Sequence, residues 1–214
     1  MASATVITRE YGRNNYPIAI GPHQNLAYSH CGGGVYIGRC IFGSAGMSSV
    51  AIGNGVIFAS NGVGIGGHAY FHCLGVAVGF RALGAEAAVG IGSHASSSRN
   101  SIVIGTYAYA QEGGVALGNG SGSYPSGISI GTHAVANSHS VAIGNFICTA
   151  MGSIFIGAGG VNGEPANEEP GSIKLSACNS CFFLSPCGLG IGIRIGQCNR
   201  LIPAAKFFSV FDHE

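Results

Sequence analysis

An aliphatic residue followed by glycine recurs every 13 residues along most of this chain. The interval repeats eight times in succession, which chance does not produce in a chain with 38 glycines among 214 residues. A fixed period of this kind indicates a repeat protein whose units stack on one another. We call the aliphatic member of each pair the anchor. The anchors are Ile52, Ile65, Val78, Ile91, Ile104, Leu117, Ile130, Ile143 and Ile156.

A second aliphatic residue precedes each anchor by two positions, and a small residue lies between them in most copies. This alternation of β-branched residues predicts a short strand, and the frequent glycine disfavours helix. Alanine recurs four positions after the anchor, as in Ala69, Ala82 and Ala95, and predicts a second short strand. The second aliphatic residues are Val50, Val63, Val76, Val89, Ile102, Val115, Ile128, Val141 and Ile154.

One repeat therefore predicts one coil of an all-β, parallel β-roll, with like residues in ladders along the stack. A 13-residue coil is too short to enclose a wide core. We expect one face of the main strand to fill the interior and the other to pack against another chain, with either face in either role. Only 8% of the residues are charged, so a lone rod would expose a large apolar surface. The two aliphatic columns are the candidate core or subunit-interface ladder.

The chain divides by pattern into three segments. Residues 1–34 are predicted to be an N-terminal cap or attachment segment, with looser early coils at Ile20 and Ile37. Residues 35–160 are predicted to be the roll. Residues 161–214 begin with a polar, proline-bearing insertion and end in a cap, with coils expected to resume at 172–175 and 188–192.

The units Ser49–Gly53 and Ser140–Gly144 resemble the head repeat of trimeric autotransporter adhesins of the YadA-like type. Ile104–Ala110 and Ile130–Ala136 match its continuation, and the resemblance covers about residues 35–160. It implies a left-handed parallel β-roll, a homotrimer around an axis, and a role in surface attachment. The family repeat is usually one residue longer, so the coil geometry is expected to differ.

Similar repeats occur in phage and viral fibres and decoration proteins. The chain shows no secretion signal, coiled-coil stalk or membrane anchor, so we expect a virion fibre, spike or decoration protein assembled in a cytosol. Its expected partners are its own copies, other virion structural proteins, and a host receptor or glycan. A bacterial cell-surface adhesin head is the alternative.

Four cysteines near the C-terminus are weak metal candidates. Cys178 and Cys181 have zinc-ligand spacing, whereas Cys187 and Cys198 do not repeat it. Buried thiols in a cap are the favoured interpretation. No metal and no cofactor are expected.

His68, His94 and His133 each lie three positions after an anchor and so share one column. Exposed turn residues are favoured over a metal site at a threefold axis. Several aromatic residues are expected near turns, where they contact a receptor or pack between chains. These are Tyr70, Phe71, Phe80, Tyr107, Tyr109 and Tyr124, with Phe207, Phe208 and Phe211 in an apolar stretch near the C-terminus.

Nothing in the sequence favours catalysis. No carboxylate pair is expected at a repeated position, and no nucleophile elbow or P-loop occurs. A left-handed β-helix acyltransferase is an alternative, but its repeat is a hexapeptide. An ice-binding solenoid needs a threonine ladder, and Thr106, Thr132 and Thr149 are scattered. The net charge of +1 and the absence of a long apolar run disfavour nucleic acid and a membrane span.

Overall fold

The computed structural model describes residues 18–157 and 170–203, apart from 22, 24, 29–33, 46–48, 60, 178–179, 185–189 and 196–197. Among these residues every regular element is a strand, and most strand pairs are parallel. The predicted all-β parallel solenoid with turns of about 13 residues is confirmed. The chain divides into two compact units, residues 1–113 and residues 114–214.

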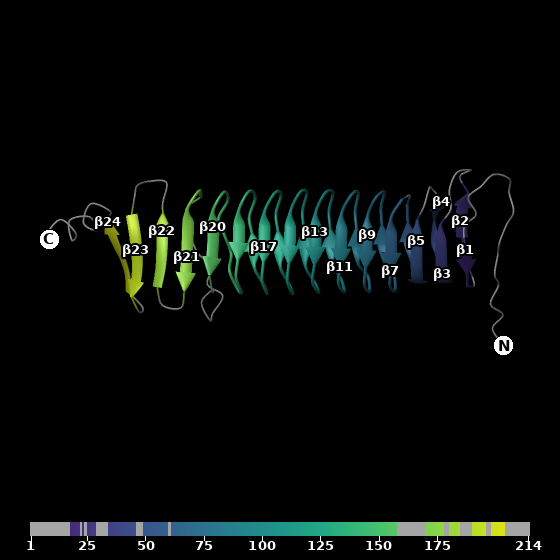
Figure 1. Ribbon diagram of the computed structural model, residues 1–214, viewed down its shortest axis with the longest axis horizontal. Helices are drawn as coiled ribbons and strands as arrows, with labels where there is room; N and C mark the ends of the chain where they lie inside the picture. Colours follow the sequence, from purple (N-terminus) through teal and green to yellow (C-terminus); the bar gives the residue numbers. More distant parts are fainter. Residues whose placement is uncertain are drawn as a thin grey trace. The chain divides into compact units, whose positions relative to one another are not determined.

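Two parallel sheets form the first unit, with one strand of each turn in each sheet (Figure 1). Pairing keeps the anchors in register, so that Ile52 lies opposite Ile65 and Ile65 opposite Val78. The main sheet contains β1 (Ile18–Ile20), β3 (Val35–Arg39), β5 (Val50–Asn54), β7 (Val63–Ile65), β9 (Val76–Val78), β11 (Val89–Ile91) and β13 (Ile102–Ile104). The second sheet contains β2 (Asn25–Tyr28), β4 (Phe42–Ala45), β6 (Ile57–Phe58), β8 (Tyr70–Phe71), β10 (Leu83–Gly84), β12 (Ser96–Ser97) and β14 (Tyr109–Ala110).

The stack begins before the regular repeat. β1 pairs in parallel with β3, placing Ile20 opposite Ile37, and β3 pairs in the same way with β5, placing Ile37 opposite Ile52. The looser early coils expected at Ile20 and Ile37 are therefore confirmed. The described part of segment 1–34 thus already contains strands of the roll.

The second unit follows the same plan. Leu117, Ile130, Ile143 and Ile156 lie in register, and Leu175 lies opposite Ile156 across a parallel pair. The coil expected to resume at residues 172–175 is therefore confirmed. The main sheet contains β15 (Val115–Leu117), β17 (Ile128–Ile130), β19 (Val141–Ile143), β20 (Ile154–Gly157), β21 (Ile173–Ala177) and β22 (Ser180–Leu184), and the second sheet contains β16 (Gly122–Ser123) and β18 (Val135–Ala136).

The parallel stack of the second unit ends at β21. β22 pairs antiparallel with β21, and β23 (Gly190–Ile195) pairs antiparallel with β24 (Cys198–Pro203). The expectation of a stacked coil at residues 188–192 is wrong for Gly190–Gly192, which lie in this antiparallel pair. A strand that runs back along its neighbour cannot continue a coil whose successive strands are parallel.

The small residues of the main strands face the interior of the roll, and the aliphatic pairs face outward. In β9, Ala77 is fully buried between the half-buried Val76 and Val78. In β13, Val103 is fully buried while Ile102 and Ile104 are 43% and 45% exposed. The aliphatic columns therefore lie outside the core of the roll, and the inward positions of the main strands are mainly Ala, Gly and Ser.

Stacked aromatic rings fill the interior of the early turns of the first unit. The ring of Phe58 lies 5.1 Å from that of Tyr36 and 5.4 Å from that of Phe71, with interplanar angles of 17° and 15°. Gly62 and Gly64 face the ring of Phe71, where a β-carbon on either glycine would collide with it. Rings and glycines thus complement each other in volume across the interior.

Buried serines replace these rings in later turns, and their hydroxyls bond to backbone carbonyls. Ser97 Oγ donates to the carbonyl of Leu83 at 2.7 Å, and Ser129 Oγ donates to that of Ala134 at 2.7 Å. Burying a hydroxyl is costly unless it is hydrogen-bonded. These bonds allow polar hydroxyls to be buried in the interior beside small residues.

The glycine after each anchor is required by the turn. Gly66 has a φ of +133°, and a β-carbon there would collide with the carbonyl oxygen of Gly79 in the next turn. Turn residues also bond between coils, since His68 N donates to the carbonyl of Asn54 at 2.8 Å. The aliphatic-glycine pair in the sequence therefore indicates a strand that ends in a tightly stacked turn.

Candidate functional site

An aliphatic face covers the outside of each main sheet. Every position on it is Val, Ile or Leu, and none carries a charge. In the first unit it consists of Ile18, Ile20, Val35, Ile37, Val50, Ile52, Val63, Ile65, Val76, Val78, Val89, Ile91, Ile102 and Ile104. In the second unit it consists of Val115, Leu117, Ile128, Ile130, Val141, Ile143, Ile154, Ile156, Ile173 and Leu175. Extended apolar surfaces of this kind mark interaction sites.

The second sheet of the first unit carries a less uniform outward column. Phe42, Ile57 and Tyr70 lie one above the other in paired strands and are exposed. Leu83 follows and Ser96 continues the column as a polar, exposed residue. The apolar character of this sheet therefore changes along the stack, whereas that of the aliphatic face does not.

The first turn of each coil forms a second feature, a row of rings that we call the ring ridge. In the first unit it consists of His68, Phe80, Arg81, His94 and Tyr107. His68, Arg81, His94 and Tyr107 lie three positions after an anchor, and all four have φ between +53° and +57°. This left-handed conformation, uncommon outside glycine, turns successive side chains outward at the same edge of the stack.

The rings of the ridge contact one another from turn to turn. Phe80 lies 6.1 Å from His68 and 5.5 Å from His94, both with edge-to-face geometry. The ring of Tyr107 stacks on His94 at 4.8 Å with an interplanar angle of 14°. The guanidinium carbon of Arg81 lies 5.3 Å from the centroid of Phe80. Such contacts stabilise exposed rings in a defined arrangement.

The second unit repeats the ridge in shorter form. His133 stacks on Phe146 at 5.2 Å with an interplanar angle of 26°. Asn145 Oδ1 accepts a hydrogen bond from Thr132 N at 2.9 Å, which ties the same two turns together. No cation-ring contact is found at these described turns. The His133–Phe146 pair therefore resembles the ring ridge of the first unit, but has no counterpart of the Arg81 guanidinium among its described contacts.

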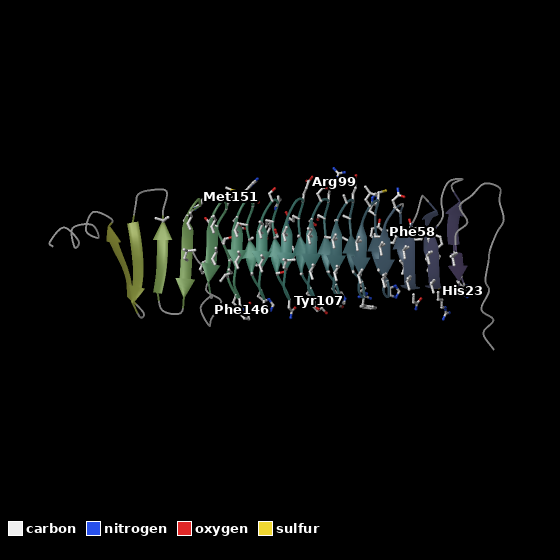
Figure 2. All side chains as sticks on the ribbon, in the orientation of Figure 1. His23, Phe58, Arg99, Tyr107, Phe146 and Met151 are labelled. Carbon is white, nitrogen blue, oxygen red and sulfur yellow. The ribbon has the colours of Figure 1, made fainter. Side chains whose placement is uncertain are left out.

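A row of charged side chains lies on the other turn of the coil. Glu86, Arg99 and Glu112 each lie eight positions after an anchor, so the expectation that no carboxylates share a repeated position is wrong. Arg99 Nη2 lies 2.7 Å from Glu86 Oε2, and both side chains are exposed. The hydrogen bond and charge of Glu86, with a smaller contribution from Glu112, raise the pKa of Arg99. In Figure 2, Arg99 and Tyr107 lie at opposite edges of the first unit.

The structure places the predicted histidine column at the turns of the ring ridge. His68 and His94 lie in one column, with the ring of Phe80 in contact with both. Among the described residues, no group of three or more His, Cys, Asp or Glu is arranged to hold a metal ion. The side chains of Cys178, Cys181, Cys187 and Cys198 lie outside the described residues.

The aromatic residues that were predicted to contact a partner differ in their burial. Tyr70, Phe80, Tyr107 and Tyr124 are all exposed, Tyr107 most of all at 64%. Phe71 is fully buried in the roll, so its place among the surface aromatics is wrong. Phe207, Phe208 and Phe211 lie outside the described residues.

The contact between Phe80 and Arg81 was not anticipated from the sequence. Periodicity places Arg81 in the histidine column, but Phe80 lies one position earlier, in a column shared with Ser93 and Thr106. The sequence does contain a signal for this contact, namely an aromatic residue directly followed by an arginine at a predicted turn. The ring of Phe80 contacts His68 in the turn before it and His94 in the turn after it.

Comparisons of the chain with protein-family models, with curated proteins and with solved structures found no match. The resemblance to adhesin head repeats therefore depends on the repeat residues alone. Among the residues that the structure describes, no helix is long and apolar enough to cross a membrane.

Proposed function

We propose that this chain is a non-enzymatic structural module that associates side by side with its own copies as a homotrimer and serves in surface attachment. The observation that carries the proposal is the aliphatic face. Two outward columns of Val, Ile and Leu run along each main sheet without a charged or polar interruption. A surface of this uniformity in contact with water favours burial against a partner.

A second copy of the same chain is the partner that best fits this face. Identical rolls arranged in parallel about one axis bring like turns to the same level, so that aliphatic columns meet aliphatic columns along the whole contact. The repeat spacing then matches automatically along the contact. Threefold symmetry is supported by the resemblance of the repeat to YadA-like heads, which are trimers.

The test is the molecular mass of the assembly that the full chain forms in solution. We expect a species of three chains that persists at low micromolar concentration, measured by light scattering after size exclusion and by mass photometry. A folded monomer at those concentrations would exclude self-association through the aliphatic face. A stable dimer would exclude the threefold arrangement while retaining the face as an interface.

We further propose that the trimer is a fibre, spike or decoration protein on a virion. Support comes from the similarity of the repeat to those of phage and viral fibres. Labelling of particles and of whole cells with antibodies against the chain, viewed by electron microscopy, separates this location from the alternative of a bacterial cell surface. Label on cells that carry no particles would overturn the virion assignment.

A further inference from the structure

We propose that the ring ridge of the first unit binds an acidic polysaccharide, with sugar rings against Phe80 and Tyr107 and a carboxylate paired with Arg81. This inference deepens the adhesive part of the proposed function and rests on it. It concerns a different surface from the aliphatic face. A trimer that buries the aliphatic face therefore need not cover the ridge.

The shape of the ridge fits a linear polymer. Its rings occupy successive turns of one edge, from His68 through Phe80 and His94 to Tyr107, and each contacts the next. Parallel turns are about 4.8 Å apart, so rings recur at short, regular intervals along the row. A row this narrow lacks the broad patch that a stable protein partner needs. A chain of flat, ring-shaped units can follow it.

The ridge also supplies a positioned cation. The Arg81 guanidinium carbon lies 5.3 Å from the centroid of the Phe80 ring, so the charge and an aromatic face are presented together. A guanidinium donates paired hydrogen bonds that match a carboxylate or sulfate. His94 Nδ1 lies 3.0 Å from Ser93 Oγ, which helps to orient that ring. A sugar carboxylate at Arg81 would therefore lie beside a ring on which its own sugar can stack.

Charge is segregated between the two turn edges of the first unit. Arg39 and Arg81 belong to the edge of the ridge, where the described turns carry no carboxylate. Glu86 and Glu112, the carboxylates among the described residues, lie with Arg99 on the other turn. Figure 2 shows Arg99 and Tyr107 at these opposite edges. An anionic ligand is therefore attracted to the ridge rather than to the acidic edge.

The density of cations favours a glycan over a nucleic acid. Nucleic acids bind through many phosphate contacts, each neutralised by Lys or Arg. The described edge offers two guanidinium groups, at Arg39 and Arg81, and several rings. Stacking with an occasional charge pair suits a sugar polymer with carboxylates on some or all of its units.

The test uses the full chain and three acidic probes: oligogalacturonate, hyaluronan and polysialic acid. Oligogalacturonate with its carboxylates methyl-esterified is the neutral control of the same backbone. We expect at least one acidic probe to bind. If it is oligogalacturonate, esterification should weaken binding about tenfold or more, the effect of losing a charged hydrogen-bond pair. Absence of binding by all three probes overturns the inference.

Two variants locate the site. Arg81→Asn removes the guanidinium with a residue that tolerates the left-handed conformation, and Phe80→Ser introduces the residue found in the same column at Ser93. Each should lower affinity about tenfold. The matched controls are Arg99→Asn, which removes an equal charge from the other edge, and Phe146→Ser, which removes a ring from the ridge of the second unit. Neither control should change binding.

Each other outcome has a definite meaning. Equal losses in Arg81→Asn and Arg99→Asn would show attraction by overall charge, and would overturn the site. An oligodeoxythymidine that binds more tightly than every acidic glycan would overturn the ligand class in favour of nucleic acid. Mass measured on the same samples keeps the two proposals apart. An intact trimer without glycan binding refutes only this inference, whereas a monomer refutes the proposed self-association.

Discussion

The ring of Phe71 occupies the space that a side chain on Gly64 would need. A β-carbon on Gly64 would lie 2.5 Å from Cδ1 and Cε1 of that ring. Both residues belong to the same turn, Gly64 on β7 and Phe71 on β8, and face each other across the interior. At this turn, the small residue between the two aliphatic positions of the main strand is therefore glycine, because a ring lies opposite it.

Gly64→Ala should destabilise the roll by about 1–3 kcal/mol, the usual cost of overpacking a close-packed interior. Urea unfolding followed by circular dichroism measures this change. Phe71→Ala should cost about 3–5 kcal/mol because it leaves a cavity. The double variant should be more stable than the sum of the two changes predicts, since the new methyl group enters the vacated space. Strict additivity would show that the two sites are not coupled.

Gly92→Ala tests the glycine that follows the anchor. Its φ is +133°, and a β-carbon there would collide with the carbonyl oxygen of Gly105 in the next turn. We expect a loss of about 2 kcal/mol or more from strain and steric conflict. Thr106→Ala, at an exposed turn position of the next coil, is the control and should change the thermal midpoint little. Equal stability of Gly92→Ala and the parent chain would contradict the stacked-turn geometry.

Ile104→Glu should dissociate the proposed trimer. Ile104 lies on the aliphatic face and is 45% exposed in the single chain. Close packing of copies there would bury carboxylates beside one another, which is strongly unfavourable. Ser96→Glu places the same charge on the exposed outer side of the second sheet and should leave the number of chains in the assembly unchanged. If the Ile104→Glu variant remains a trimer, the interface lies on another face.

Glu86→Gln should leave thermal stability almost unchanged. The side chains of the Glu86–Arg99 pair are both exposed to solvent, and exposed pairs contribute little. The raised pKa of Arg99 means that its stabilising effect is present below its unfolded-state pKa and is lost only under strongly alkaline conditions. Around neutral pH, titration of Arg99 therefore adds no pH dependence. Melting curves at low and high salt test this, and a large drop at low salt would show that the charged row is structurally important.

The coil length and its register could be predicted from the sequence because the repeat is strictly periodic. The anchor-glycine pairs align in parallel strands, as the pairing of Ile65 with Val78 shows. The column shared by His68, Arg81 and Tyr107 was predictable for the same reason. The hairpin formed by β23 and β24 was not, since Gly190–Gly192 resemble the repeat locally but pair with a neighbour of opposite direction.

The repeat by itself determined that this chain folds into stacked two-strand turns, because a fixed period places like residues at like positions. It did not determine which side of the main strand is enclosed, since both sides lack charge. The tertiary structure decided this through volume. The narrow interior accepts Ala77 and a stacked ring such as Phe71 opposite Gly64, while Val76 and Val78 remain outside. The closure of the coil, which no local pattern encodes, therefore sets which surface is left for partners.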